Sequence, residues 1–587
     1  MTFESGVRIG ADPSIRFRRL LSAAILTALP FCLLGQSTPS YSQTAPGAGQ
    51  LLQTVPQQAP RAPQELQLEM RLRESKSLTD VEGMRIEVKG FRLIGLSLVP
   101  EADVQKVLTP FLGENRNFQT LIDAAAKVKE FLAQRGYFLA NAIIPEQKIV
   151  DGVVEILILE GKLGKVKIEY DQDVQINRSL VESYAAQLKE GSFISAAAVE
   201  RALFLISDMK GIQVRSVFEP GATVGSSDLT IKVSRTRAAE ANLDLDANGS
   251  IYTGVFRAGA GADLNNPFKR GDLLSFRYTT ALERMRPSTL QFLRISYLTP
   301  IGRWGTKIGG SFADLKYKLG TPIFQPLQAT GSAEVQSLIG IHPLIRSRNA
   351  NLLVSYQFDG RRFHDIQATT ERMSDKTTQL STYGLSGDYR DPLFGGGINV
   401  YNFAQTAGRL AFATDALRTG DQAGHFTAGN YHKANFTYSR LQSVTERTAL
   451  YFSYSQQIAS KNLDPSEKFS LGGPSAVRAY PQGEGAGDEG YYGTVEARFR
   501  LPASEKIPGT IVLTVFHDFG WSRVNKNPLE ADTVNTRKVA GAGVGLNWEV
   551  PGNWALRTSI AYQQTAAPLS ENVARDPHVY FFFTKYF

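Results

Sequence analysis

The side chains that most often perform enzymatic chemistry are scattered along this chain. Gly384-Leu385-Ser386-Gly387 places a serine among glycines, but it lacks the second glycine spacing of a nucleophile elbow. No glycine-rich phosphate loop with its lysine occurs. The histidines show no spacing typical of metal ligands; they are His342, His364, His425, His432, His517 and His578. The sequence therefore predicts no catalytic residue, no metal, no cofactor and no enzymatic activity.

One carboxylate, Asp518, lies in a segment whose faces differ sharply in polarity. A strand places successive side chains on opposite faces, so Asp518 shares a face with Phe516 and Gly520. The other face is apolar and fits lipid; it carries Leu513, Val515, Phe519 and Trp521. We therefore expect the Asp518 carboxylate to point into the water-filled interior of a membrane barrel.

The same alternation recurs in bursts of roughly ten residues from position 238 to the end of the chain. Between Thr494 and Leu501, for example, Val495 and Phe499 alternate with Glu496 and charged neighbours. The pattern predicts a transmembrane β-barrel of about sixteen antiparallel strands over residues 237–587. The longest surface loops are expected near 360–378, 410–430, 460–488 and 522–536.

The last predicted strand carries alternating large side chains. Val579, Phe581 and Phe583 keep the period of two, and the chain stops on the aromatic Phe587. Outer-membrane barrels usually end in such a strand signal. Lys585 departs from it, because an aromatic or apolar residue is usual at that place.

The amino end has the composition of a secretory signal peptide over residues 1–42. Arg16, Arg18 and Arg19 precede an apolar stretch, and Ser40-Tyr41-Ser42 offers small residues for cleavage. The only cysteine, Cys32, lies inside this segment, so we expect no disulfide in the mature protein. An exported chain without a later apolar run of about 18 residues points to the outer membrane of a Gram-negative cell.

The charge of the chain does not favour nucleic acid as a partner. The formal net charge is +8, and removal of residues 1–42 takes away four basic and two acidic residues, which leaves +6. Because the basic residues are dispersed along alternating strands and not clustered, a lining of the barrel interior explains them more simply.

Residues 43–82 are rich in proline, glutamine and small residues, which is typical of a flexible linker. Within it, Gln50 to Val55 has the pattern of a short amphipathic helix. Glu65 to Ser75 fits either a helix or a strand, and the pattern alone leaves both open.

Two α/β modules precede the barrel, at 83–161 and 162–236. Each reads in the order β-α-α-β-β. In the first, Leu121, Ala125, Val128 and Leu132 share one face of a helix predicted over 117–134. The repeat of about 75 residues indicates tandem domains.

This order, with Gln134-Arg135-Gly136-Tyr137 leading into a strand and the second copy ending at the barrel, resembles a pair of POTRA domains. The resemblance implies a periplasmic location and capture of exported polypeptides. Capture would proceed by addition of an extended client strand to an open sheet edge. A role as simple stalks is the alternative.

Val477-Arg478-Ala479-Tyr480 resembles the Val-Arg-Gly-Tyr loop of two-partner secretion translocators, and Phe516, Asp518 and Gly520 match the barrel-wall motif of that superfamily. The resemblance implies that the loop folds into the barrel and that Arg478 forms a salt bridge with Asp518. Ala479 replaces the glycine of the family, which argues against a positive φ at that position.

The resemblance therefore predicts an outer-membrane translocator of the haemolysin-activator and filamentous-haemagglutinin transporter type. Its implied partners are a secreted β-rich exoprotein, outer-membrane lipid and the barrel-assembly machinery during biogenesis. The amino-terminal helix is expected to plug the resting pore. A barrel-assembly insertase and a passive porin-like channel are the alternatives; an insertase usually carries more modules, and a porin would leave residues 83–236 without a role.

Overall fold

The computed structural model of the chain describes residues 45–55, 67–70, 85–223, 225–282, 288–530, 532, 534–570 and 575–587. The predicted signal peptide at 1–42 lies outside the described residues, as does most of the linker. Within the described ranges, no helix has both the length and the apolar character needed to cross a bilayer.

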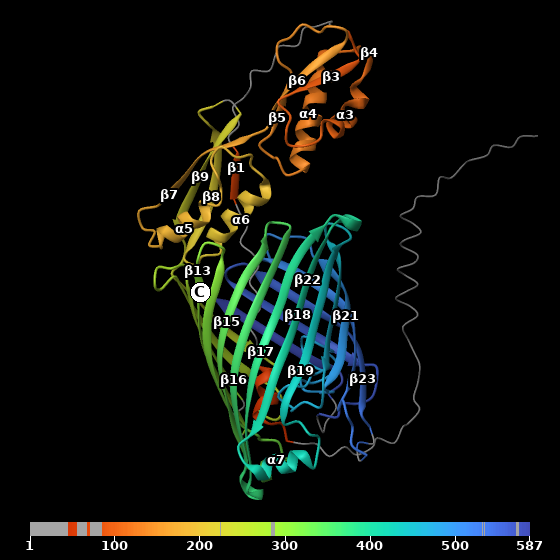
Figure 1. Ribbon diagram of the computed structural model, residues 1–587. Coiled ribbons are helices and arrows are strands. Elements are labelled where there is room, and N and C mark those ends of the chain that lie inside the picture. Colours follow the sequence, from red (N-terminus) through yellow and green to blue (C-terminus); the bar gives the residue numbers. More distant parts are fainter. Residues whose placement is uncertain are drawn as a thin grey trace, which may run out of the picture. The chain divides into compact units, whose positions relative to one another are not determined.

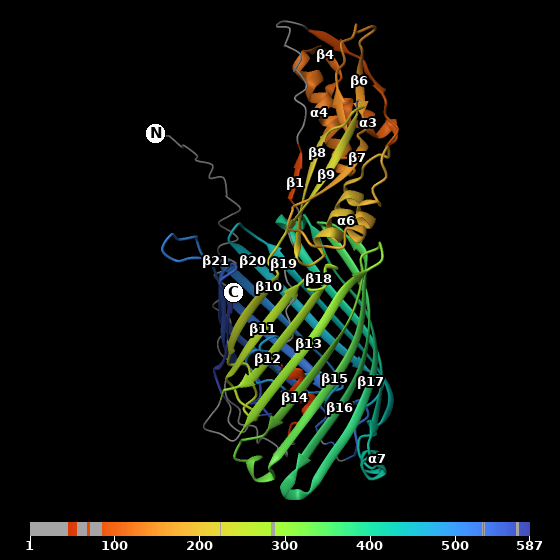
Figure 2. The same ribbon diagram turned by 90° about the vertical axis from the view of Figure 1, so that its left-hand side faces the viewer.

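The carboxyl-terminal part of the chain forms a closed barrel of sixteen strands, β10 to β25, which confirms the predicted barrel. Figures 1 and 2 show these strands tilted around a single ring. Each strand pairs antiparallel with its chain neighbours. The strands are β10 (Ala239–Asp246), β11 (Arg257–Asn265), β12 (Leu273–Ala281), β13 (Thr289–Ile301), β14 (Thr306–Lys318), β15 (Ala329–Arg346), β16 (Ala350–Gln367), β17 (Arg372–Asp391), β18 (Gly397–Phe412), β19 (Gly429–Ser443), β20 (Thr448–Ala459), β21 (Glu489–Arg500), β22 (Thr510–Arg523), β23 (Thr536–Val550), β24 (Trp554–Gln563) and β25 (His578–Tyr586).

The alternation of side chains separates an apolar outer face from a polar lumen. On β22, Leu513 and Val515 are exposed on the outside, whereas Phe516 and Asp518 are buried on the inside. The ring closes where β25 pairs with β10, over only five residue pairs, from Asn242 with Tyr586 to Asp246 with Phe582. Closure removes the unpaired strand edges that an open sheet would expose in lipid.

The lengths of the strands correct one expected loop. Residues 360–378 were predicted as a long loop, but β16 runs to Gln367 and β17 starts at Arg372, so only four residues connect them. Continuous cross-strand pairing over eighteen residue pairs outweighs the polar composition that suggested a loop. The loop at 413–428 contains helix α7 (Asp415–Gln422), with Thr414 accepting a hydrogen bond from Leu417 N–H at 3.3 Å as its N-cap.

The first α/β module packs two helices against a three-stranded sheet ordered β3-β6-β5. Helix α4 (Phe118–Gln134) begins at Asn117, whose side chain caps Thr120 N–H at 2.9 Å. The other elements are β2 (Ile86–Val88), β3 (Gly90–Ile94), α3 (Glu101–Leu108), β4 (Gly113–Arg116), β5 (Asn141–Ile143) and β6 (Val153–Leu159). Residues 86–94 form two strands, β2 and β3, and a short further strand, β4, pairs with β2.

The second module repeats the pattern and gains one strand from the linker. Its sheet has the order β1-β8-β9-β7, in which β1 (Gln67–Met70) runs parallel to β8. Of the two conformations left open for residues 65–75, the structure shows a strand at Gln67–Met70, and the rest of that range lies outside the described residues. The remaining elements are β7 (Lys162–Tyr170), α5 (Arg178–Ala185), α6 (Ala196–Ser207), β8 (Ile212–Pro220) and β9 (Ser226–Arg235).

A short helix from the linker, α2 (Ala48–Thr54), lies inside the barrel, where it is the red helix in Figures 1 and 2. Its Leu51 is buried against lumenal side chains of the wall, among them Leu315 and Phe363. Helices of seven residues are marginal on their own, so this packing is what stabilises α2.

Candidate functional site

The centre of the lumenal site is Arg478, carried by the long loop between β20 and β21. The backbone N–H and Nε of Arg478 both donate to Oδ2 of Asp518 on β22, at 3.0 and 2.9 Å. Its Nη2 donates to Oδ1 of the same carboxylate at 2.8 Å. Asp518 is fully buried. The structure thus joins the two residues in a bidentate ion pair, the strongest geometry for a guanidinium and a carboxylate.

The neighbouring strand β21 supplies two further partners for Arg478. Its Nη1 donates to Glu496 Oε2 at 2.9 Å, and its Nη2 donates to Thr494 Oγ1 at 3.0 Å. Arg498 in turn donates to the other oxygen of Glu496 at 2.8 Å. Two guanidinium groups therefore face two carboxylates, and the buried cluster is balanced in charge. Such balance is what a buried ion pair needs, because an unpaired charge there is costly.

An aromatic ring completes the surroundings of Arg478. The guanidinium carbon lies 3.3 Å from the ring centroid of Phe516, the first residue of the wall motif. A cation close to a ring face gains a favourable cation–π interaction, and more so where water is excluded. Phe516 and Asp518 therefore contact the same guanidinium from one face of β22.

The residues beside Arg478 pack tightly on the wall. Val477, Ala479 and Tyr480 are all fully buried and form one apolar cluster with wall residues. Ala479 does not adopt a positive φ. Its methyl instead faces Gly541 on β23, where an added Cβ would lie 2.3 Å from the Ala479 Cβ. Gly541 of the wall therefore leaves room for the methyl of Ala479, the loop residue that stands where the family has glycine.

Gly520, the third residue of the wall motif, also lies against the loop. A Cβ at Gly520 would approach Leu471 Cδ2 to 3.2 Å, which is tighter than ordinary contact. The absent side chain at this position lets Leu471 pack against the wall.

Polar contacts hold the part of the loop that follows Arg478. Tyr580 on the last strand donates its hydroxyl to the Tyr480 carbonyl at 2.8 Å. Glu484, fully buried, accepts from Arg537 Nε at 2.8 Å and from the backbone N–H groups of Leu569 and Ser570, each at 2.9 Å. The loop is thus held to β22, β23 and β25 together.

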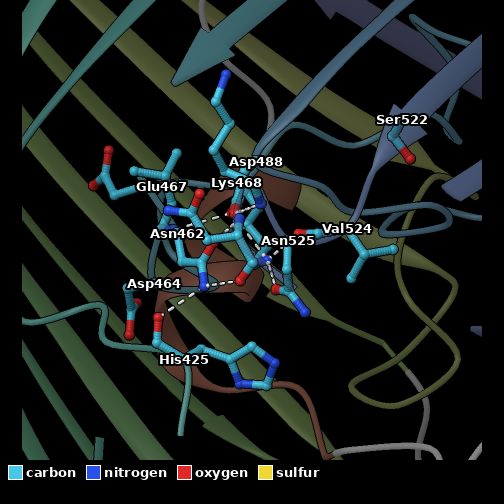
Figure 3. Close-up of polar contacts among 12 residues, drawn as sticks. His425, Asn462, Asp464, Glu467, Lys468, Asp488, Ser522, Val524 and Asn525 are labelled. Atoms are coloured by element: carbon cyan, nitrogen blue, oxygen red, sulfur yellow. Dashed lines mark hydrogen bonds and ion pairs between the residues drawn. The ribbon is translucent and has the colours of Figure 1, made fainter. Parts of the chain in front are cut away.

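The two ends of the loop are held by a second buried network, drawn in Figure 3. Its centre is Asp488, which pairs with Lys468 at 2.9 Å and accepts the backbone N–H groups of Leu463 and Lys526 at 3.0 and 2.8 Å. Asn462 donates to the carbonyl of His425 at 2.8 Å. Three loops, at 413–428, 460–488 and 524–535, therefore meet. They follow β18, β20 and β22, so all three lie at the same end of the barrel.

Two more carboxylates of the loop bind cations of the wall. Asp464 pairs with Lys376 on β17 at 2.8 Å. Glu467 pairs with Lys433 on β19 at 2.8 Å and with Arg361 on β16 at 3.1 Å. These contacts hold the first part of the loop against the opposite side of the lumen from Arg478.

Helix α2 is held at both ends by charged wall residues. The Ala48 N–H donates to Asp365 Oδ1 at 2.9 Å, and the Gly47 N-cap has no side chain to do so. At the other end, Arg257 Nη1 donates to the Thr54 carbonyl at 2.9 Å. An anion at the N-terminus and a cation at the C-terminus of a helix both oppose its macrodipole and stabilise it.

Helix α2 also touches the loop that carries Arg478. Gln53 Nε2 donates to the Ser466 carbonyl at 2.5 Å. A Cβ added at Gly49 would lie 2.3 Å from the Cβ of Ser466, so the two segments pack in close contact. The inserted loop and the inserted helix thus occupy the lumen as one contacting unit.

The residues of the predicted carboxyl-terminal signal lie on or after β25. Val579 and Phe581 are exposed on the outer face, and Phe583 is partly buried on the same face. Phe587 follows the strand and is exposed. The ammonium of Lys585 lies 5.8 Å from the Phe587 ring centroid, so an aromatic contact accompanies the charge that breaks the pattern.

Several site residues were not predicted. Thr494 and Glu496 are opposite Asp518 and Phe516 in the β21–β22 register, so a correct strand pairing would have placed them beside Arg478. Asp365 and Arg257 had no comparable signal, because they meet α2 only through the closed barrel. Within the part of the chain that the structure describes, no group of three or more potential metal ligands comes together.

A sixteen-strand barrel preceded by POTRA-like modules, with a buried arginine loop in its lumen, defines an outer-membrane translocator of polypeptides. The model of the family described as haemolysin secretion/activation protein ShlB/FhaC/HecB matches residues 225–548, and that of the ShlB-type POTRA domain matches residues 86–161. The chain belongs to the ShlB/FhaC/HecB family, whose location is the outer membrane with POTRA domains in the periplasm.

Named relatives agree with this assignment. The heme/hemopexin transporter protein HuxB of Haemophilus influenzae strain 86-028NP is 27% identical over 474 residues, which cover 80% of this chain and 81% of HuxB. The outer membrane transporter CdiB of Escherichia coli strain 536 is 22% identical over 492 residues, covering 83% and 81% of the two chains. The predicted two-partner secretion function is therefore confirmed.

Solved structures share the fold. CdiB from Escherichia coli superimposes with a TM-score of 0.64 at 18% identity, covering 87% of this chain and 92% of that one. BamA from Haemophilus ducreyi lacking POTRA domains 1–3 gives 0.50 at 14% identity, covering 85% and 100%. At these identities the likeness shows the fold alone.

Proposed function

We propose that this translocator is closed at rest by two lumenal segments, helix α2 and the Arg478 loop, and that an exoprotein passes after they rearrange. The bidentate contact of Arg478 with Asp518 carries this proposal, because it fixes a long loop inside a pore that must conduct a polypeptide. Transport requires no catalytic group or cofactor in this scheme. Folding of the β-rich client outside the cell supplies the driving force.

The outer surface and the last strand suggest the remaining partners. The exposed apolar side chains of the wall fit outer-membrane lipid. The alternating residues of β25, ending at Phe587, fit recognition by the barrel-assembly machinery during biogenesis. We assign no nucleic acid as a partner.

Residues 83–161 are proposed to take part in capturing the client. Deleting them is expected to leave the barrel inserted, because it has its own closed sheet, while binding of the client is lost. The measurement is a pull-down of the detergent-solubilised variant from outer membranes, with the amino-terminal domain of its exoprotein client as bait. Undiminished binding by the inserted deletion variant would contradict a capturing role and favour a stalk.

The second module has a sheet edge that is already occupied. Strand β1 covers β8 by parallel pairing, with Gln67 opposite Arg215 and Met70 opposite Phe218. A client strand can add to β8 only if β1 leaves, because each edge offers one row of free N–H and C=O groups. We propose that the client displaces β1, and that this displacement pulls on the linker that leads to α2.

A reversible cross-link tests the displacement. Cysteines at positions 67 and 215, which are paired in register, are expected to block secretion when oxidised and to restore it on addition of reductant. The control is Arg215→Cys alone, which is tolerated because Arg215 is exposed. This single variant has no cysteine partner for an internal disulfide, because the only native cysteine, Cys32, lies in the predicted signal peptide. Full secretion by the oxidised double variant would show that β1 stays in place during transport.

A further inference from the structure

Helix α6 of the second module is buried on all sides at its carboxyl end. Residues 202–207 are all buried, and six consecutive residues span about 1.7 turns of a helix. A helix that packs against one partner buries a single stripe, so this end of α6 must face two partners. Leu203 and Ile206 belong to the apolar core of the second module. Phe204 lies outside that core and contacts the barrel instead.

The barrel contact is made by Arg346, the last residue of β15. Its Nε and Nη2 donate to the two carboxylate oxygens of Asp208, which follows α6, at 2.9 and 2.8 Å. Its guanidinium carbon lies 4.5 Å from the ring centroid of Phe204, and the Arg346 side chain is only 11% exposed. A bidentate carboxylate and an aromatic ring on one guanidinium are the same combination that holds Arg478 in the lumen.

Arg346 is in turn fixed to the barrel wall. Its Nη1 donates to Asn351 Oδ1 on β16 at 2.8 Å. Asn351 Nδ2 donates to both carboxylate oxygens of Asp388 on β17, at 3.1 and 3.2 Å. From β14, Lys307 Nζ donates to the Asp208 carbonyl at 3.2 Å. Two cations and two carboxylates therefore meet, and four adjacent strands share in holding the end of the helix.

A β-bulge in the wall gives α6 a second contact. The pairing of β15 with β16 shifts register between Pro343 and Ile345, so Leu344 has no partner residue on β16. A bulge turns backbone groups of its strand away from the regular ladder. Arg201 of α6 donates to the carbonyls of Pro343 and Leu344, at 3.1 and 2.9 Å. The bulge therefore supplies acceptors to the helix.

Two turns of the barrel lie tightly against the same region. Gly271, between β11 and β12, and Gly305, between β13 and β14, both have a positive φ. A Cβ at Gly305 would lie 2.3 Å from Leu205 Cδ2, and one at Gly271 would lie 2.7 Å from Met209 Cβ. Glycine therefore permits an approach that a larger residue would prevent.

We propose that Arg346 is a positioning residue for transport, which fixes the second module on the barrel in one orientation throughout the transport cycle. To swing away, the module would have to strip Arg346 of its bidentate partner and expose Phe204 and Leu205 to water, and both changes are unfavourable. A client captured by the modules is then held at a constant place relative to the pore. The proposal goes beyond the closure of the resting pore, because it requires neither α2 nor the Arg478 loop to move.

The first test compares Arg346→Ala with a matched control in the full chain. Secretion of the exoprotein client by Arg346→Ala is expected to fall at least about tenfold, because the module is released from the barrel. The control is Arg440→Ala. Arg440 makes the same bidentate contact, with Asp391 at 2.7 and 3.0 Å, and its polar contacts among the described residues all lie within the barrel. Because β15 and β19 run in the same direction, Arg440 lies near the same end of the barrel, and its removal should leave secretion unchanged. Heat-dependent gel mobility verifies that each barrel is folded.

A cross-link distinguishes orientation from any other role of Arg346. Glu200 of α6 and Arg348 of the β15–β16 turn lie at the edge of the interface, where the Glu200 carboxylate is 3.9 Å from Arg348 Nε. Glu200→Cys together with Arg348→Cys allows a short bifunctional thiol reagent to join the module to the barrel. Joining is expected to leave secretion by the otherwise unsubstituted chain unchanged and to restore secretion by the Arg346→Ala chain.

Pulsed electron paramagnetic resonance measures the orientation itself. Spin labels are placed at Lys189→Cys on the second module and at Arg447→Cys on the β19–β20 turn, since both residues are exposed. One narrow distance distribution is expected for the labelled chain, and a broad one when Arg346→Ala is added. The proposal is overturned if the cross-link stops secretion, since the module must then swing, or if it fails to restore the Arg346→Ala chain. Normal secretion by Arg346→Ala, or an equal loss in Arg440→Ala, would overturn it as well.

Discussion

Arg478→Ala is expected to leave the sixteen-strand barrel folded and to reduce secretion of the exoprotein to a trace. The substitution leaves Asp518 and Glu496 buried without their shared guanidinium, at a cost of about 3 to 5 kcal/mol. That cost shifts the equilibrium between the docked and the undocked loop by roughly two to nearly four orders of magnitude. Secretion is expected to fall because, in the proposed cycle, the loop must return to the docked state before the next exoprotein enters. Secretion is measured as exoprotein in the medium, normalised to the amount of folded variant in the membrane.

Two further variants show whether the geometry or only the charge of Arg478 is required. Arg478→Lys keeps the charge but loses the planar group that reaches Asp518, Glu496 and Thr494 at once, so it should recover little activity. The double variant Arg478→Ala with Asp518→Ala should lose less docking free energy than the sum of the single variants. Normal export by folded Arg478→Ala would refute a role for the inserted loop in transport.

The barrel was predictable from the sequence because its signal is local. On β21 and β22 the polar side chains alternate with lipid-facing ones, and this period of two is imposed by the strand itself. The same local character explains why α4 was predicted within one residue of its observed start at Phe118. Loop lengths were less predictable, since residues 360–378 are polar and yet most of them continue the two long strands β16 and β17.

The site was predictable only in part. The pair of Arg478 and Asp518 came from a resemblance, because no spacing in the chain connects residues forty positions apart. Glu496 was visible as a lumenal residue, but its place beside Arg478 depends on the register of β21 against β22. The resemblance led us to expect the amino-terminal helix in the pore, but the wall residues that hold α2 could not be predicted, because Ala48 and Asp365 are 317 positions apart and meet only when the ring closes.

The strand β1 shows the same limit at a smaller scale. The apolar residues of the segment 65–75 did not separate the helical period from the strand period, so both conformations stayed open. Pairing with β8 decided the outcome. Segments that take their conformation from a partner in this way are those that a transport cycle can release, because little local preference holds them in place.

Asp365→Ala is expected to free helix α2 from the lumen more often and to raise the conductance of the resting pore. The variant removes the acceptor of the Ala48 N–H and of the Tyr317 hydroxyl, which donates to it at 2.7 Å. The loss of a charged cap costs about 1 to 3 kcal/mol, so the open fraction should rise about five- to hundredfold. Single-channel recording in planar bilayers measures that fraction directly.

The matched control for this variant is Asp375→Ala. Asp375 belongs to β17 and pairs with His364, which is adjacent to Asp365 on β16 and therefore points to the opposite face of the wall. Its removal deletes a carboxylate at the same level without touching α2. An equal conductance rise in both variants would mean that wall charge, and not the seat of α2, sets the resting pore. If the rise is confined to Asp365→Ala, it should disappear when α2 is deleted. Without α2, the Asp365→Ala barrel and the unsubstituted barrel are expected to have the same resting conductance.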